Sequence, residues 1–127
     1  VPRYRRFVEA VHALGLQCYI HVCGNAVPLF ELMADTGTDG IEPLDPLGGV
    51  SVADAKKRVG SRVALKGGVD TLAFLDSAEK VYALSKEVLE EGAPGGGFIL
   101  GSGDDIPRDA KPEAVLAMVR AAKEYRY

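Results

Sequence analysis

The sequence predicts a parallel α/β fold in which one helix is followed by four strand–helix units. Two observations lead to this prediction. Short segments rich in β-branched and aromatic residues alternate along the chain with longer segments whose apolar residues recur at helical spacing. Glycine, proline or other turn residues separate most of these segments. Alternation of this kind places the strands in one parallel sheet with the helices packed against it.

The predicted helices combine an apolar stripe with recognisable start and stop residues. Gly15 ends the first helix, as glycine often does just past a helix terminus. Ser51 and Asp54 form an acceptable capping box, and Pro112 suits the first turn of the last helix. The predicted helices are residues 3–14, a short helix between Asn25 and Gly37, residues 52–59, a long helix from Ser77 to the break at Gly92, and a helix from Pro112 onward. The expected apolar faces are Leu29, Leu32 and Met33; Val81, Leu84 and Val88; and Val115, Leu116 and Val119.

Four predicted strands cover residues 17–23, 40–44, 62–66 and 98–100. Two architectures accommodate them: a small open doubly wound sheet, or half of a (β/α)8 barrel. The chain has 127 residues, which is about half of the ~250 residues usual for such a barrel. In both architectures ligands bind at the carboxyl ends of the strands, so candidate functional residues are sought there.

The composition is that of one globular domain spanning residues 1–127. A net charge of −3 gives no basic footprint, so we expect no nucleic-acid partner. No apolar run approaches the length of a bilayer span and no signal-peptide pattern opens the chain, so we expect a cytoplasmic protein without a membrane contact. In a reducing cytoplasm, Cys18 and Cys23 are more often metal-binding, catalytic or inert than disulfide-bonded.

The sharpest local signal is His21-Val22-Cys23-Gly24-Asn25 at the end of the first predicted strand. Side chains alternate across a strand, so His21 and Cys23 share one face and Cys18 lies on the other. An imidazole and a thiolate two residues apart are well placed to bind zinc. The alternative is a hydrogen-bonded histidine beside an inert cysteine. Cys18, with the opposite parity, is expected in the core.

Carboxylates and glycines follow the other strands. Glu42 is either a third zinc ligand, a substrate-binding group, or a structural carboxylate paired with a lysine or arginine. Gly67 and Gly68 permit close backbone approach to a ligand, and Asp70 is either functional or a cap for the next turn. In the last loop, Gly103 keeps the backbone accessible, while Asp104 is a ligand, an acid/base or a loop-stabilising residue.

Taken together, three motifs resemble the uroporphyrinogen decarboxylase superfamily, which contains porphyrinogen decarboxylases and zinc-dependent cobalamin methyltransferases. The first is His21-x-Cys23-Gly24-Asn25, which is similar to the strand-five motif of the methyltransferases. The second is Leu65-Lys66-Gly67-Gly68-Val69-Asp70, and the third is residues 97–106 followed by Lys111-Pro112-Glu113-Ala114-Val115. The resemblance covers essentially the whole chain and implies the C-terminal half of a (β/α)8 barrel, strands five to eight with their helices.

In the methyltransferase branch, the resemblance implies zinc held by the histidine and cysteine of the first motif and by a cysteine after strand eight. Asp104 stands at that last position here. The related cobalamin-independent methionine synthases add a glutamate on strand six, where Glu42 occupies a comparable place. The implied metal ligands are therefore His21, Cys23, Glu42 and Asp104. Glu42, Asp70 and Asp104 would be catalytic, and Gly67, Gly68 and Gly103 would line the cofactor. The implied reaction moves a methyl group between a corrinoid, carried by a cobalamin-binding partner, and a thiol.

Two other functions stay open. Decarboxylation of the acetate side chains of a tetrapyrrole is the activity of the other branch, whose members are metal-free, lack the His-x-Cys pair and usually have histidine where Asp104 stands. An inactive fragment or a corrinoid-binding partner is the third possibility. Because the chain begins at Val1 and offers only four units, we expect it to need an N-terminal half-barrel or a second copy. The isolated chain is expected to be inactive.

Overall fold

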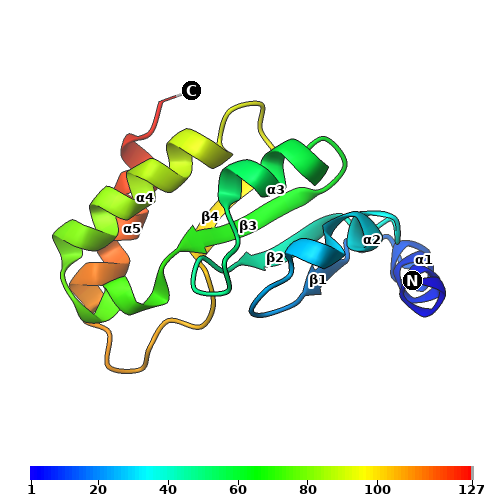
Figure 1. Ribbon diagram of the computed structural model, residues 1–127, viewed down its shortest axis with the longest axis horizontal. Helices are drawn as coiled ribbons and strands as arrows, with labels where there is room; N and C mark the ends of the chain where they lie inside the picture. The colour runs from blue at the N-terminus through cyan, green and yellow to red at the C-terminus, as the bar shows by residue number, and fades with distance from the viewer. Residues whose placement is uncertain (127) are drawn as a thin grey trace.

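A computed structural model describes residues 1–126 and contains one four-stranded sheet (Figure 1). The strands are β1 (Tyr19–His21), β2 (Gly40–Leu44), β3 (Ala64–Val69) and β4 (Phe98–Ser102). They lie in the order β1-β2-β3-β4, and each neighbouring pair is parallel. The prediction of four adjacent parallel strands is confirmed.

Helices connect the strands in the predicted alternation. Helix α1 (Pro2–His12) precedes the sheet, and at the other end of the molecule α4 (Ala78–Gly92) and α5 (Pro112–Glu124) lie side by side (Figure 1). The predicted cap at Ser51 is present, because its side chain accepts a hydrogen bond from Asp54 N, and the Ser77 side chain accepts one from Lys80 N at the start of the long helix. The remaining helices are η1 (Val27–Leu29), α2 (Phe30–Ala34), α3 (Val52–Val59), η2 (Thr71–Leu75), α4 (Ala78–Gly92) and α5 (Pro112–Glu124).

The sequential strand order decides between the two predicted architectures. A doubly wound sheet reverses its strand order at a switch point, whereas the strands of a (β/α)8 barrel follow one another in sequence. The observed order has no reversal within the described residues. The chain therefore forms part of a barrel, with β1 and β4 at the two edges of the described sheet.

The core lies between the helices and one face of the sheet. Ile20, Ile41 and Leu65 occupy equivalent positions on neighbouring strands and are buried there. Phe30 from α2 and Phe74 from η2 pack into the same cluster and are fully buried. Burial of one such side chain stabilises the fold by about 1.5–3 kcal/mol. Because side chains alternate along a strand, the residues between these core positions point to the opposite face of the sheet.

That opposite face carries polar and exposed side chains. His21 pairs in register with Glu42, and Lys66 follows on β3. His21 and Cys23 are exposed while Cys18 and Ile20 are buried, so the predicted alternation along the first strand is confirmed. The strand itself is shorter than the predicted residues 17–23, and Cys23 lies just beyond it. The carboxyl ends of the strands thus present the candidate site on the face away from the helices.

Some predicted core positions are wrong. On α5, Leu116 and Val119 are exposed instead of facing inward. The reason is that α5 packs against α4 through small residues, which let two helices approach closely: Ala121, for example, lies in one cluster with Leu89 and Ala93. Leu29 and Leu32 are likewise exposed, and Leu84 is only partly buried. The buried residues of α5 are Ala114, Ala117 and Ala121.

Among residues 1–126, no helix combines the length and the apolar character that crossing a membrane requires.

Candidate functional site

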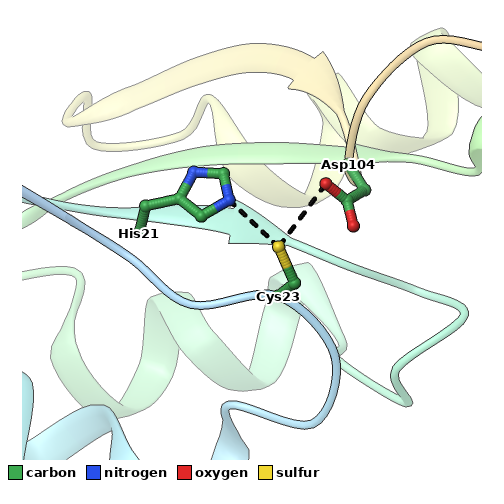
Figure 2. Close-up of side chains that lie close together, drawn as sticks. All are labelled: His21, Cys23 and Asp104. Carbon is green, nitrogen blue, oxygen red and sulfur yellow. Dashed lines mark hydrogen bonds between the residues drawn. The ribbon is translucent and has the colours of Figure 1, made fainter.

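His21, Cys23 and Asp104 come together at the carboxyl ends of β1 and β4 (Figure 2). His21 Nε2 lies 3.0 Å from Cys23 Sγ, and Cys23 Sγ lies 3.6 Å from Asp104 Oδ1. One ligand atom from each of the three residues lies within 4.8 Å of the other two. The chain thus brings together residues 81 positions apart, as their places after the strands predicted.

Two glycines let the loops after β1, β2 and β4 converge on this cluster. A Cβ atom on Gly48 would lie 2.4 Å from the carbonyl carbon of Gly24, so the β2 loop touches the β1 loop backbone to backbone. A Cβ atom on Gly103 would lie 2.5 Å from Pro46 Cδ. Larger residues in place of Gly48 or Gly103 would push the loops apart. Cys23 lies on the loop after β1 and Asp104 on the loop after β4. The approach of Asp104 to Cys23 therefore depends on the packing of three loops.

Glu42 lies beside the cluster rather than in it. One carboxylate oxygen accepts a hydrogen bond from Lys66 Nζ, and the other lies 3.5 Å from His21 Nδ1. The hydrogen bond from Lys66 lowers the pKa of Glu42, with His21 contributing further, so this carboxylate is ionised at neutral pH. The role of Glu42 as a metal ligand stays a prediction, and its carboxylate is paired with a lysine, which is the structural arrangement that the sequence also allowed. Lys66 was not identified as the partner from the sequence, because its place beside Glu42 follows from the register in which Ile41 pairs with Leu65.

Electrostatics around Cys23 favour its protonated form in the metal-free protein. Partial desolvation raises the pKa of the thiol, and the hydrogen bond to Asp104 raises it further. The negative charges of Asp104, Asp105 and Asp45 act in the same direction. Cys23 therefore lacks the positive surroundings that activate a nucleophilic cysteine. The same carboxylates attract a cation.

The other predicted site residues have roles in the local structure. Asp70 caps η2, with its side chain accepting a hydrogen bond from Leu72 N at 2.8 Å. Gly67 and Gly68 have positive φ angles of 128° and 101°, and added Cβ atoms would meet Leu44 N at 2.5 Å and Val88 Cγ1 at 2.7 Å. Gly103 has the packing reason given above. Catalytic or cofactor-binding roles for these four residues stay predictions.

An open cavity of about 420 Å³ lies next to the cluster. Its walls carry three carboxylates, Glu42, Asp104 and Asp105, against a single lysine, Lys66, among the described residues. Ser102 and Ile106 add a hydroxyl and an apolar surface. The cavity is therefore acidic at the point where the strands end.

Comparison with known proteins places this chain in a family. The model of the family described as Uroporphyrinogen decarboxylase (URO-D) matches residues 1–125. The chain belongs to the uroporphyrinogen decarboxylase family. Its four strand–helix units are accordingly part of the barrel of that family.

Curated relatives carry the same family name. A uroporphyrinogen decarboxylase of Thioalkalivibrio sulfidiphilus is 40% identical over 89 residues, which is 70% of this chain and 24% of the relative. One of Methylococcus capsulatus is 36% identical over 75% of this chain and 26% of the relative. One of Shewanella loihica is 31% identical over 82% of this chain and 31% of the relative. The chain thus spans from 24% to 31% of the length of these members of the uroporphyrinogen decarboxylase family.

The cluster fits a zinc ion by its donor chemistry. Imidazole nitrogen, thiolate sulfur and carboxylate oxygen are the three donor types that zinc takes from proteins. Bond lengths of about 2.0–2.3 Å in a tetrahedron imply donor atoms about 3–4 Å apart, and the observed separations are 3.0 Å and 3.6 Å. Three protein ligands leave a fourth position for water or substrate, which is the pattern of catalytic zinc sites.

Proposed function

We propose that the protein containing this chain is a lyase that removes carboxylate groups from a tetrapyrrole. The observation that carries this proposal is the match to relatives named uroporphyrinogen decarboxylase at 31–40% identity over most of the chain. In this function the chain supplies one wall of the barrel mouth. Lys66 would provide a cation toward a substrate carboxylate, and the exposed imidazole of His21, which lines the same cavity, is a group able to exchange a proton.

A direct assay tests the decarboxylase proposal. The whole protein is incubated anaerobically with uroporphyrinogen, and mass spectrometry follows the loss of one CO2 per acetate side chain. We expect successive products of lower mass, and replacement of Lys66 by methionine should slow their formation. No loss of CO2 under conditions where a known decarboxylase is active would refute the proposal.

A second candidate function, methyl transfer between a corrinoid and a thiol, is favoured by the His21–Cys23–Asp104 cluster. These three residues would hold zinc through one nitrogen, one sulfur and one oxygen. Zinc bound there would supply the Lewis acidity that keeps a substrate thiol deprotonated at neutral pH. The chain's own contribution is to attract the cation with its carboxylates and to leave the adjoining cavity of about 420 Å³ open for the substrate.

Metal content separates the two candidates. Zinc-dependent methyl transfer requires about one zinc per protein after purification without chelator. It also requires activity with a methylated corrinoid and a thiol, and a chelator should abolish this activity. The decarboxylase function requires neither. Metal-free protein that decarboxylates uroporphyrinogen would eliminate the second candidate. Stoichiometric zinc with no decarboxylation would eliminate the first.

Either function needs the sheet to be extended beyond this chain. β1 and β4 lie at the edges of the described sheet. The backbone N–H and C=O groups of an edge strand are free to pair with a further strand. We expect the remaining strands to come from other parts of the same protein or from a second copy. Sedimentation of the purified 127-residue chain tests the second source, because a closed barrel of two copies would sediment as a dimer.

A further inference from the structure

We propose that Glu42, anchored by Lys66, is a positioning residue that holds the His21 ring with its Nε2 lone pair directed at Cys23 and Asp104. The proposal rests on the second candidate function, since its consequence is a preformed metal-binding face. It changes the role of Glu42 from the ligand that the sequence predicted to a residue that acts through His21.

The strand register places His21, Glu42 and Lys66 side by side on three neighbouring strands. His21 on β1 and Glu42 on β2 are direct partners in the parallel ladder. Lys66 on β3 lies one residue beyond Leu65, which pairs with Ile41. Glu42 is the least exposed of the three, with 23% of its side chain accessible against 53% for His21 and 46% for Lys66. The middle strand therefore presents a partly buried carboxylate between a ring nitrogen and an ammonium group.

The two carboxylate oxygens of Glu42 have different tasks. Oε2 accepts the hydrogen bond from Lys66 Nζ, and Oε1 faces His21 Nδ1 at 3.5 Å, the outer limit of a hydrogen bond. Lys66 thus fixes the direction of the carboxylate without occupying the oxygen that faces the imidazole. An ionised carboxylate only accepts hydrogen bonds, so its favourable partner on a neutral imidazole is a protonated Nδ1.

The consequence is a choice between the two tautomers of His21. With the proton on Nδ1, the Nε2 lone pair can accept the S–H proton of Cys23, whose Sγ lies 3.0 Å away, in place of Asp104 Oδ1 at 3.6 Å from the same sulfur. With the proton on Nε2, the Nδ1 lone pair would face the negative charge of Glu42. The first tautomer is the one that binds a metal through Nε2, and carboxylate partners of metal-binding histidines orient the ring in this way.

The geometry also argues against direct ligation by Glu42. The group of ligand atoms within 4.8 Å contains His21, Cys23 and Asp104 but not Glu42. For Glu42 to join them, its carboxylate would have to leave Lys66, whose ammonium group would then be unpaired next to a cation. The arrangement therefore favours Glu42 behind the histidine rather than on the metal.

A metal-free measurement tests the tautomer directly. Nitrogen-15 NMR of the whole protein at pH 8 distinguishes a protonated Nδ1 from a protonated Nε2. We expect His21 in the wild type to be protonated mainly at Nδ1, and in Glu42→Leu to shift toward Nε2. A wild-type His21 protonated mainly at Nε2, or a tautomer unchanged in Glu42→Leu, would overturn the proposal whether or not zinc binds.

Cobalt titration with competing chelator tests the consequence for the metal. We expect Glu42→Leu to weaken cobalt binding about 10–100-fold, the usual effect of losing a partner of a ligating histidine. The cobalt–thiolate absorption and the coordination geometry should stay those of the wild type. An absorption spectrum that shows one fewer oxygen ligand would instead make Glu42 a ligand and overturn the positioning role.

A charge-matched variant excludes a purely electrostatic explanation. Glu42→Leu with Lys66→Met removes one negative and one positive charge, so the net charge of the site is unchanged. We expect this double variant to bind cobalt as weakly as Glu42→Leu, within about threefold. Recovery of wild-type affinity would show that unpaired Lys66 caused the loss and would overturn the proposal. A wild-type protein that binds no cobalt would instead refute the second candidate function, independently of the NMR result.

Discussion

Replacement of Gly48 by alanine should disturb both the stability of the protein and the geometry of the cluster. The added Cβ would lie 2.4 Å from the carbonyl carbon of Gly24 and 2.5 Å from its oxygen. An ordinary contact begins near 3.4 Å, so two backbone segments must separate by about 1 Å. Overpacking of this kind costs about 1–3 kcal/mol. Because Gly24 follows Cys23 directly, the same displacement should move the thiol relative to Asp104.

Gly49→Ala is the matched control for Gly48→Ala. Gly49 has a φ angle of +79° but open space around its added Cβ, so alanine there should cost about 1–2 kcal/mol through backbone strain alone. Urea unfolding measures both losses, and cobalt titration measures the cluster. We expect weaker cobalt binding in Gly48→Ala and unchanged binding in Gly49→Ala. Wild-type stability and cobalt affinity in Gly48→Ala would refute the inference that loop contact sets the site.

Three further predictions concern individual side chains. Cys23→Ser should abolish zinc in elemental analysis, whereas Cys18→Ser should retain it, because Cys18 is buried on the opposite face; equal zinc loss in both would contradict the assignment. Asp104→Cys should bind zinc more tightly and add a second cobalt–thiolate band, since a thiolate replaces the carboxylate; an unchanged spectrum would place Asp104 outside the site. The hydrogen bond from the backbone N–H of Cys18 lowers the pKa of Asp39, and the hydrogen bond with His12 lowers it further. The ionised Asp39 therefore stabilises the folded protein fully above its unfolded pKa, and this contribution disappears as the pH falls through the lower folded pKa. Asp39→Asn should therefore lose about 1 kcal/mol at pH 7 and approach the wild type in acid, as urea unfolding at several pH values can show; a gap that persists in acid would contradict this.

The sequence predicted the fold well because its signals are local. Ser51 and Ser77 cap the helices that follow them, and the alternation around His21 places Cys18 and Ile20 in the core. The exposed Leu116 could not be predicted in the same way. Which face of α5 is buried depends on its packing against α4, a tertiary choice that an apolar stripe alone does not fix.

For the site, the sequence identified residues but not all of their partners. The positions of His21, Cys23 and Asp104 at strand ends were sufficient to expect them near one another. The pairing of Glu42 with Lys66 depends on the register between β2 and β3, and the packing role of Gly48 depends on how close two loops come. Both depend on how close segments far apart in the sequence come in the fold, which composition and residue spacing do not reveal.

The charges at the strand ends distinguish the two candidate functions. A tetrapyrrole carrying several carboxylates needs cations around it, yet this wall of the cavity offers Lys66 against Glu42, Asp104 and Asp105, and Glu42 already binds the Lys66 ammonium group. A decarboxylase would therefore have to obtain its substrate-binding cations from the rest of the barrel. Zinc would neutralise this wall locally, because one divalent cation together with Lys66 offsets the three carboxylates. The described wall thus suits a cation better than a polycarboxylate, while the relatives' names favour decarboxylation. If Lys66→Met leaves uroporphyrinogen turnover unchanged in a protein that holds zinc, then this wall serves the metal, and the acidity of the cavity has its explanation.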